Sequence, residues 1–389
     1  MYNGEYMAFY LMVGIPYALI NLWTAWWAWR CLAGTGPVRV CVCLAIVFLA
    51  LLFPLFYRRP GDSFFNLALT RIGAAWIGVF FYIFLMALLA DAALLAARFW
   101  NHPLSPAVRQ AVCGGVLALC VCIGTVSWFI AAMPMVREYD LEVPAGESVL
   151  KRWGGKPLTI AAVADMHLGK IITAARLEKV LELVAPHKPD LLLFLGDLLD
   201  DHFLLDREAM KRAVSGVAAP LGVYGIAGNH EYLSGPIAVS IDIHEQSGIK
   251  VLRDQWTELE GGVILLGRDD YSMARFPGGR RKELPDIMAD MPAGLQGRPL
   301  IVMDHEPYHL EQAEQAGAAL QLSGHTHNGQ FWPFNLVVAR VFENPLGYLR
   351  RGGTHYVTSA GAGTWGPPLR NTARPDVLLI RLRFVAEAR

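Results

Sequence analysis

Five short clusters in the second half of the 389-residue chain carry side chains that divalent metal ions prefer as ligands. Carboxylates, an amide and imidazoles supplied from several loops are what a hydrolytic two-metal centre requires. In chain order, the clusters are Asp165-Met-His167, Gly196-Asp197-x-x-Asp200, Gly228-Asn229-His230-Glu231, Asp304-His305 and Gly324-His325-Thr326-His327. The sequence therefore predicts a dinuclear metal site that activates water.

The reaction expected of such a site is hydrolysis of a phosphoester. Two ions in a site of this kind lie about 3.5–4 Å apart and hold a hydroxide between them, because bound water ionises near about pH 7. The hydroxide attacks phosphorus in line while the ions neutralise charge on the phosphoryl oxygens. Asp197 is the natural bridging carboxylate. A single Asp-x-His pair is more often a turn, so the prediction depends on all five clusters occurring together.

Each cluster directly follows an apolar run of strand length. These runs are 158–164, 191–195, 222–227, 300–303 and 319–322. Further strands are expected at 263–266, 354–359 and 377–382, and an apolar stripe predicts a helix at 174–185. This alternation favours an α/β fold with stacked sheets and outer helices. Since ligand sites in open α/β sheets lie beyond the carboxyl ends of strands, the five loops can converge on one crevice.

The ordered clusters resemble the calcineurin-like metallophosphoesterase superfamily over about residues 155–385. The resemblance implies a four-layer α-β-β-α sandwich at 157–389. It implies two divalent ions, with Mn²⁺ the first choice and Fe, Zn, Co or Mg as alternatives. The implied ligands are Asp165, His167 and His327 on one ion, Asn229, His305 and His325 on the other, and Asp197 between them. His230 would stand beside the leaving group as acid or transition-state stabiliser, oriented by Asp200.

The tail of the chain resembles the membrane-anchored bacterial branch of that superfamily. The residues concerned are Gly329-Gln330 and Gly361-x-Gly363-Thr364-Trp365-Gly366-Pro367-Pro368-x-Arg370. Relatives in that branch include hydrolases of UDP-2,3-diacylglucosamine. Phe331, Trp332, Trp365 and Arg370 are therefore candidate substrate contacts, with the aromatic residues as an apolar lip for a lipid-bearing substrate. The alternative is that the aromatic residues pack the edge of the sandwich.

Residues 1–136 have the composition of a membrane region. They hold seven Arg, three acidic residues, no Lys and all six Cys. Four apolar runs, at 7–29, 40–57, 72–97 and 110–136, are long enough for a membrane span, which needs about 20 residues or about 17 at the lower limit. The second run qualifies narrowly. The alternative is a buried helical domain of a soluble protein. Residues 137–156 are expected as a linker or first edge strand.

The charge distribution bears on topology and partners. Four spans place the N-terminus and the catalytic domain on the same side of the membrane. The basic residues of the two sides nearly balance, and Lys151, Arg152 and Lys156 favour the cytoplasmic side of a bacterial inner membrane. A formal net charge of zero gives no reason to expect nucleic acid as a partner. Membrane lipids and a phosphoester, for which a lipid-linked form is considered, are the expected partners, and the sequence leaves the oligomeric state open.

The function expected from these features is hydrolysis of a phosphodiester or pyrophosphate bond in a lipid or nucleotide-lipid substrate. Two alternatives remain at this stage. One is a membrane sensor or transporter that its phosphoesterase domain regulates, for which Asp91 within an apolar run is the supporting residue. The other is an anchored phosphatase that acts on a soluble substrate.

Overall fold

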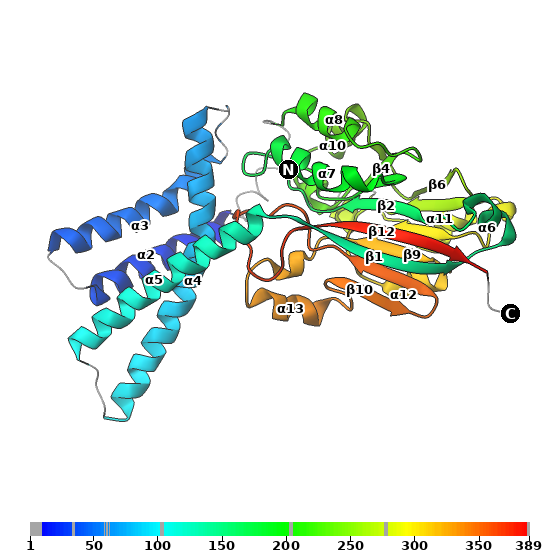
Figure 1. Ribbon diagram of the computed structural model, residues 1–389. Coiled ribbons are helices and arrows are strands. Elements are labelled where there is room, and N and C mark those ends of the chain that lie inside the picture. Colours follow the sequence, from blue (N-terminus) through cyan, green and yellow to red (C-terminus); the bar gives the residue numbers. More distant parts are fainter. Residues whose placement is uncertain are drawn as a thin grey trace. The chain divides into compact units, whose positions relative to one another are not determined.

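The computed structural model describes residues 10–32, 36–57, 59, 61, 63–101, 105–201, 205–275 and 279–386. The chain forms two compact units. One reaches to residue 129 and includes 366–369, and the other comprises 130–365 together with the chain from 370 onward. The helices and strands of both units are labelled in Figure 1.

The first unit is helical. A π-helical turn, η1 (Tyr10–Gly14), continues into α2 (Ile15–Cys31), which is followed by α3 (Gly36–Phe56), α4 (Phe64–Phe99) and α5 (Pro106–Ala132). Among the described residues, α3, α4 and α5 are long and apolar enough to cross a membrane. They correspond to the expected spans at 40–57, 72–97 and 110–136. The fourth expected span, 7–29, falls on η1 and α2, and its residues 7–9 lie outside the described residues.

The end expected for the last span, at residue 136, is wrong. The helix ends at Ala132, and Met135 begins a strand. Pro134 explains the change, because proline disfavours helical backbone in the residue before it and cannot donate the hydrogen bond that would continue the helix.

Asp91 has two partners within the helical unit. Its Oδ2 accepts a hydrogen bond from Arg30 Nη2 at 2.8 Å, and its Oδ1 accepts one from Trp27 Nε1 at 3.2 Å. A carboxylate in an apolar helix is costly unless it is paired. These contacts give Asp91 a structural role that links α4 to α2.

The second unit contains two mixed six-stranded sheets. In spatial order, the first sheet is β1 (Met135–Pro144), β12 (Asp376–Val385), β2 (Leu158–Val163), β3 (Leu191–Leu195), β4 (Val223–Ile226) and β5 (Lys250–Val251). The second sheet is β10 (Gly347–Arg351), β11 (Thr354–Thr358), β9 (Leu320–Ser323), β8 (Leu300–Met303), β7 (Val263–Gly267) and β6 (Gln255–Leu259). Figure 1 shows β12, in red, beside β1 and β2.

Alternate residues of β2 show how the layers stack. Ile160 and Ala162 pack in the core between the two sheets, whereas Ala161 and Val163 pack under the helices on the outer face. Those helices are α7 (Ala174–Val184), α8 (Arg207–Ser215) and α10 (Ile237–Gln246). On the second sheet, α11 (Leu284–Ala289) and α12 (Leu310–Gln315) cover the outer face. The result is an α-β-β-α arrangement, which confirms the expected α/β class.

The expected linker at 137–156 is partly regular structure. Residues 135–144 form β1, which pairs in parallel with β12 at the edge of the first sheet, and Glu147–Trp153 form α6. An edge strand with one solvated face carries charged residues and so lacks the continuous apolar run of a buried strand. Its sequence, Met-Val-Arg-Glu-Tyr-Asp-Leu-Glu-Val-Pro, has this mixed character.

Candidate metal centre

The five clusters lie in loops at the carboxyl ends of five strands. Asp165 follows β2, Asp197 follows β3 and Asn229 follows β4 in the first sheet, while His305 follows β8 and His325 follows β9 in the second. The loops contact one another across the two sheets, since the backbone N–H of His325 donates to both carboxylate oxygens of Asp165, at 2.9 and 3.1 Å. The two sheets therefore supply one common site.

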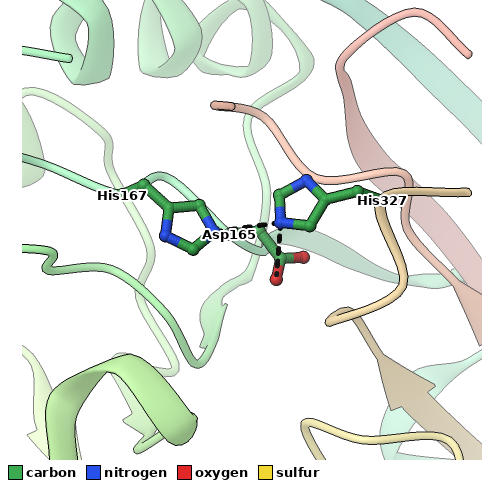
Figure 2. A group of neighbouring side chains, drawn as sticks. All are labelled: Asp165, His167 and His327. Atoms are coloured by element: carbon green, nitrogen blue, oxygen red, sulfur yellow. Dashed lines mark hydrogen bonds and ion pairs between the residues drawn. The ribbon is translucent and has the colours of Figure 1, made fainter. Parts of the chain in front are cut away.

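One group of potential ligands consists of Asp165, His167 and His327 (Figure 2). All three are buried. His167 Nε2 lies 2.9 Å from His327 Nε2, and His327 Nε2 lies 3.7 Å from Asp165 Oδ1. The Nδ1 of His167 donates to Asp200 Oδ1 at 2.7 Å, which leaves the lone pair of Nε2 directed at the other two side chains.

A second group consists of Asp197, His305 and His325, with Asn229 beside them. His305 Nε2 lies 3.2 Å from Asp197 Oδ2 and 3.3 Å from Asn229 Oδ1. His325 Nδ1 lies 2.9 Å from Asn229 Oδ1. The other ring nitrogen of His305 donates to the carbonyl of Leu195 at 2.7 Å, so Nε2 is the nitrogen that faces Asp197 and Asn229.

The spacing of these atoms fits metal coordination. Ligand atoms held about 2.1 Å from a common ion, at angles of about 90–110°, are separated by about 3.0–3.4 Å. The contacts among Asp197, Asn229, His305 and His325 span 2.9–3.3 Å. These side-chain atoms face one another across one small region, so a cation bound there would have them as ligands.

The charges of the site also fit cations. Burial raises the pKa of the Asp165 carboxyl to about 6, and the Asp197 carboxylate adds to the rise. The charge of His305 acts in the other direction and lowers this pKa. Burial and the same Asp197 carboxylate raise the pKa of Glu231 to about 7. Divalent ions between the two groups would favour the ionised forms of these carboxylates.

His230 and Asp200 form a third part of the site. The Nδ1 of His230 donates to Asp200 Oδ1 at 2.7 Å, the same oxygen that receives His167. Burial disfavours the charged imidazole, but the carboxylates of Asp197 and Asp200 outweigh it and raise the pKa of His230 to about 9. With Asp197 and His167, His230 also forms a group compact enough to hold an ion. Because its Nδ1 is bound to Asp200, its Nε2 is the atom available for other chemistry.

The comparison with known proteins identifies the domain. Residues 158–329 match the family model for calcineurin-like phosphoesterases. A protein of Aquifex aeolicus named as a metallophosphoesterase is 27% identical over 267 residues, which cover 68% of this chain and 98% of the relative. The domain is a calcineurin-like metallophosphoesterase. It is therefore a metal-dependent hydrolase of phosphoric esters.

Two further relatives extend the comparison. A metallophosphoesterase of Helicobacter pylori is 31% identical over 236 residues, and the match covers 58% of this chain and 60% of the relative. A transmembrane protein with metallophosphoesterase domain from Danio rerio is 27% identical over 339 residues, covering 81% of this chain and 74% of the relative. The second match is too long to lie within the metallophosphoesterase domain alone, and with the apolar helices it indicates a membrane protein.

The metallophosphoesterase site depends on strained backbone at its ligands. Asp165, His167, Asp197, His325 and His327 all have positive φ, between 46° and 66°. Left-handed backbone costs energy for residues other than glycine and is found mostly where the surrounding structure enforces it for function. The ligand residues therefore make many of the sharp turns at the site themselves.

Glu231 has a structural role that sequence reasoning missed. Its carboxylate accepts hydrogen bonds from four backbone N–H groups, of Asp197, Leu198, Leu199 and Gly228, at 2.8–3.0 Å. It thereby joins the loop after β3 to the start of α9 (Asn229–Leu233). The signal was present, because the Gly-Asn-His-Glu motif ends in this carboxylate.

Arg370 is a correction to the expected substrate contacts. Its side chain is fully buried, and its Nη2 lies 2.7 Å from His327 Nδ1. It also donates to the carbonyls of Ala360 and Gly361. Arg370 meets Nδ1 of His327, whereas Nε2 of the same ring faces His167 and Asp165. Arg370 therefore positions a potential metal ligand, and its burial keeps it from contact with substrate.

The aromatic candidates have a different placement. Trp365 is 58% exposed, and its ring meets the His230 ring edge-on at a centroid distance of 6.2 Å. Gln330 holds this loop in place, since its side-chain amide bonds both the N–H and the carbonyl of Trp365 at 2.9 Å. Phe331 is half-buried and Trp332 is 49% exposed, so neither is committed to the core.

Replacing Gly228 by alanine should disrupt the metal site. A Cβ at this position would overlap the Asp197 carboxylate and lie 2.8 Å from His305 Nε2. We expect the Gly228→Ala protein to bind at least about tenfold less metal at limiting concentration, as measured by mass spectrometry of the purified protein. The matched control is Gly294→Ala, where nothing lies within 4 Å of the new Cβ. Full metal content in Gly228→Ala would contradict this packing.

Arg370→Lys separates a positioning role from substrate contact. A lysine cannot retain the three bonds of the guanidinium, so His327 should lose its fixed orientation. Because residues that orient ligands typically affect metal affinity by about 10–100-fold, we expect that loss with little change in KM at saturating metal. Arg381→Lys, in a solvent-exposed ion pair, serves as control. Normal metal affinity with a raised KM would restore Arg370 as a substrate contact.

Proposed function

We propose that this chain is a membrane-bound, dinuclear-metal phosphoesterase that cleaves a phosphodiester or pyrophosphate bond of a lipid or nucleotide-lipid substrate. The observation that carries the proposal is the position of Asp197. Its Oδ2 lies 3.2 Å from His305 Nε2 in one group and 4.0 Å from His167 Nε2 in the other. One carboxylate oxygen that faces both groups is suited to bridge two ions.

The proposed ligands follow the two groups. Asp165, His167 and His327 hold one ion, Asn229, His305 and His325 hold the other, and Asp197 is shared. We propose Mn²⁺ as the natural metal, since this mixture of carboxylate, amide and imidazole ligands suits it, although Fe, Zn and Co accept similar ligands. When bound, two such ions supply an activated water and neutralise charge on the phosphoryl oxygens.

His230 supplies the proton in this proposal. Asp200 accepts its Nδ1–H, and the nearby carboxylates favour the protonated ring. As the bond between phosphorus and the leaving oxygen breaks, His230 Nε2–H donates its proton to that oxygen. Asp200 also orients His167, so one carboxylate couples the acid to the ligand shell.

The substrate class is inferred from the surroundings of His230. Trp365 is exposed beside it, and Trp332 is exposed five residues after His327 in the chain. Exposed aromatic side chains beside a polar site favour a substrate with an apolar part. In a membrane protein, phosphodiesters and pyrophosphates that carry acyl chains are substrates of that kind.

The proposal includes a topology. The five residues of η1 and the seventeen of α2 form a continuous helix of 22 residues, which is long enough for a fourth span. Four spans place the N-terminus and the metallophosphoesterase domain on one side. The basic residues Lys151, Arg152 and Lys156 favour the cytoplasmic face of a bacterial inner membrane. The pairing of Asp91 with Arg30 and Trp27 gives a structural explanation for the residue that favoured a sensor or transporter.

His230→Ala and Asp197→Ala should separate catalysis from metal binding. Loss of the proton donor should lower kcat by about 10²–10⁴-fold while leaving the metal content close to normal. Loss of the bridging carboxylate should remove both activity and metal. Metal analysis beside steady-state kinetics makes the comparison, with the exposed His309→Ala as control. Equal metal loss in the two variants would mean that His230 is a ligand.

Model substrates test the bond that is cleaved. We expect a higher kcat/KM for bis-p-nitrophenyl phosphate than for p-nitrophenyl phosphate, because the proposed natural substrate has two substituents on phosphorus. A preference for the monoester would contradict the diesterase assignment.

The Trp365→Ala variant tests the lipid part of the same proposal. Removal of the exposed ring should raise KM for an acyl-bearing phosphodiester by about tenfold and leave KM for bis-p-nitrophenyl phosphate nearly unchanged. An equal effect on both substrates would favour a soluble substrate.

A further inference from the structure

Helix α13 (Phe334–Val341) is apolar, yet none of its residues is buried. The exposed fractions are 48% for Leu336, 56% for Val337 and 53% for Val341. Isolated helices shorter than about 12–15 residues are marginal in water, so an eight-residue helix needs an apolar environment or tertiary packing for its stability. The exposed side chains indicate that this environment comes from outside the catalytic domain.

The chain itself keeps the domain at the membrane. The apolar helix α5 ends at Ala132, and β1 begins at Met135, so only Met133 and Pro134 connect them. Two extended residues span at most about 7 Å. Wherever the domain lies, the end at which β1 begins therefore stays close to the end of a helix that can cross the bilayer.

Hydrogen bonds within the catalytic unit connect that end to the base of α13. Arg374 Nη2 donates to the carbonyl of Met133 at 3.2 Å. Three residues earlier, Asn371 Oδ1 accepts from the N–H of Trp332 at 2.8 Å, and Asn371 N–H donates to the carbonyl of Gln330 at 3.1 Å. The segment 371–374 thus ties the short connection after α5 to the residues immediately before α13.

We propose that α13 lies in the plane of the membrane interface, with lipid covering its apolar side chains. The composition suits this position. Trp332 precedes the helix, Arg340 lies in its last turn, and the stretch 329–342 contains no acidic residue. Tryptophan prefers the headgroup region, and a basic residue at the boundary favours anionic lipids. The occupant is the bilayer that α3, α4 and α5 cross.

The placement has a consequence for the site. The 3-10 turn η5 (His327–Gly329) contains a proposed metal ligand and is separated from α13 by only four residues, 330–333. A helix seated in the interface would hold Trp332 and the loop that carries this ligand near the lipid headgroups. This consequence rests on the proposed lipid substrate, whereas the position of α13 does not.

Lipid quenching tests the position of α13 directly. The full chain is reconstituted in nanodiscs of phosphatidylethanolamine and phosphatidylglycerol, with one fluorescent amino acid inserted at Val337. Reference probes are placed at Val126, on α5, and at the exposed Glu178, on α7. We expect doxyl-labelled lipid to quench Val337 at least about twofold more than Glu178 and to approach the quenching at Val126. Leu336→Asp should reduce the quenching at Val337.

Two outcomes would overturn the proposal. One is lipid quenching at Val337 no greater than at Glu178, with full access to aqueous iodide, which would mean that α13 faces water. The other is protection from iodide without lipid quenching, which would mean that protein covers α13. In that case the iodide measurement is repeated in nanodiscs that hold a single chain. Iodide access that returns there would identify a second copy of the chain as the cover. None of the quenching measurements depends on turnover, so failure of the proposed function would leave the position of α13 unaffected.

Discussion

The burial of the Asp197 carboxylate between two sets of imidazoles is the interaction on which the rest of the site depends. A buried charge is costly unless it is paired and hydrogen-bonded. Asp197 meets this cost with His305 on one side, His167 on the other and the N–H of His230 on its second oxygen. The loops after β2, β3, β4 and β8 must therefore come together, and divalent ions would complete the balance of charge.

This demand explains why two sheets are needed. A single sheet supplies loops at one edge, but the ligands of this site come from strands of both sheets, whose carboxyl ends face the same region. Glu231 holds the loops of the first sheet to one another, and the bond from His325 N–H to Asp165 joins the two sheets. The strained backbone at the ligands is the cost of this convergence, and the packed core between the sheets supports it.

Sequence reasoning predicted the elements that have strong local signals. The buried strands β3 and β8 are continuous apolar runs, and β2 has a single polar residue. The expected metal-binding side chains follow these strands directly, so both could be recognised from local pattern. Arg370 could not be placed, because an arginine has the same local signature whether it contacts substrate or lies behind His327. The strand β1 was ambiguous for a similar reason, since its pairing with β12 joins residues more than two hundred positions apart. Long-range packing determines where Arg370 and β1 lie, and that packing cannot be inferred from the local sequence pattern.

The shared carboxylate can be tested most directly by electron paramagnetic resonance of the Mn²⁺-loaded full chain, with metal content measured in parallel. If Asp197 bridges two ions, the protein should bind two Mn²⁺ per chain and show the exchange-coupled signal of a dinuclear pair, and Asp197→Asn should weaken or abolish that coupling. A signal from isolated Mn²⁺ alone, at one ion per chain, would contradict the account.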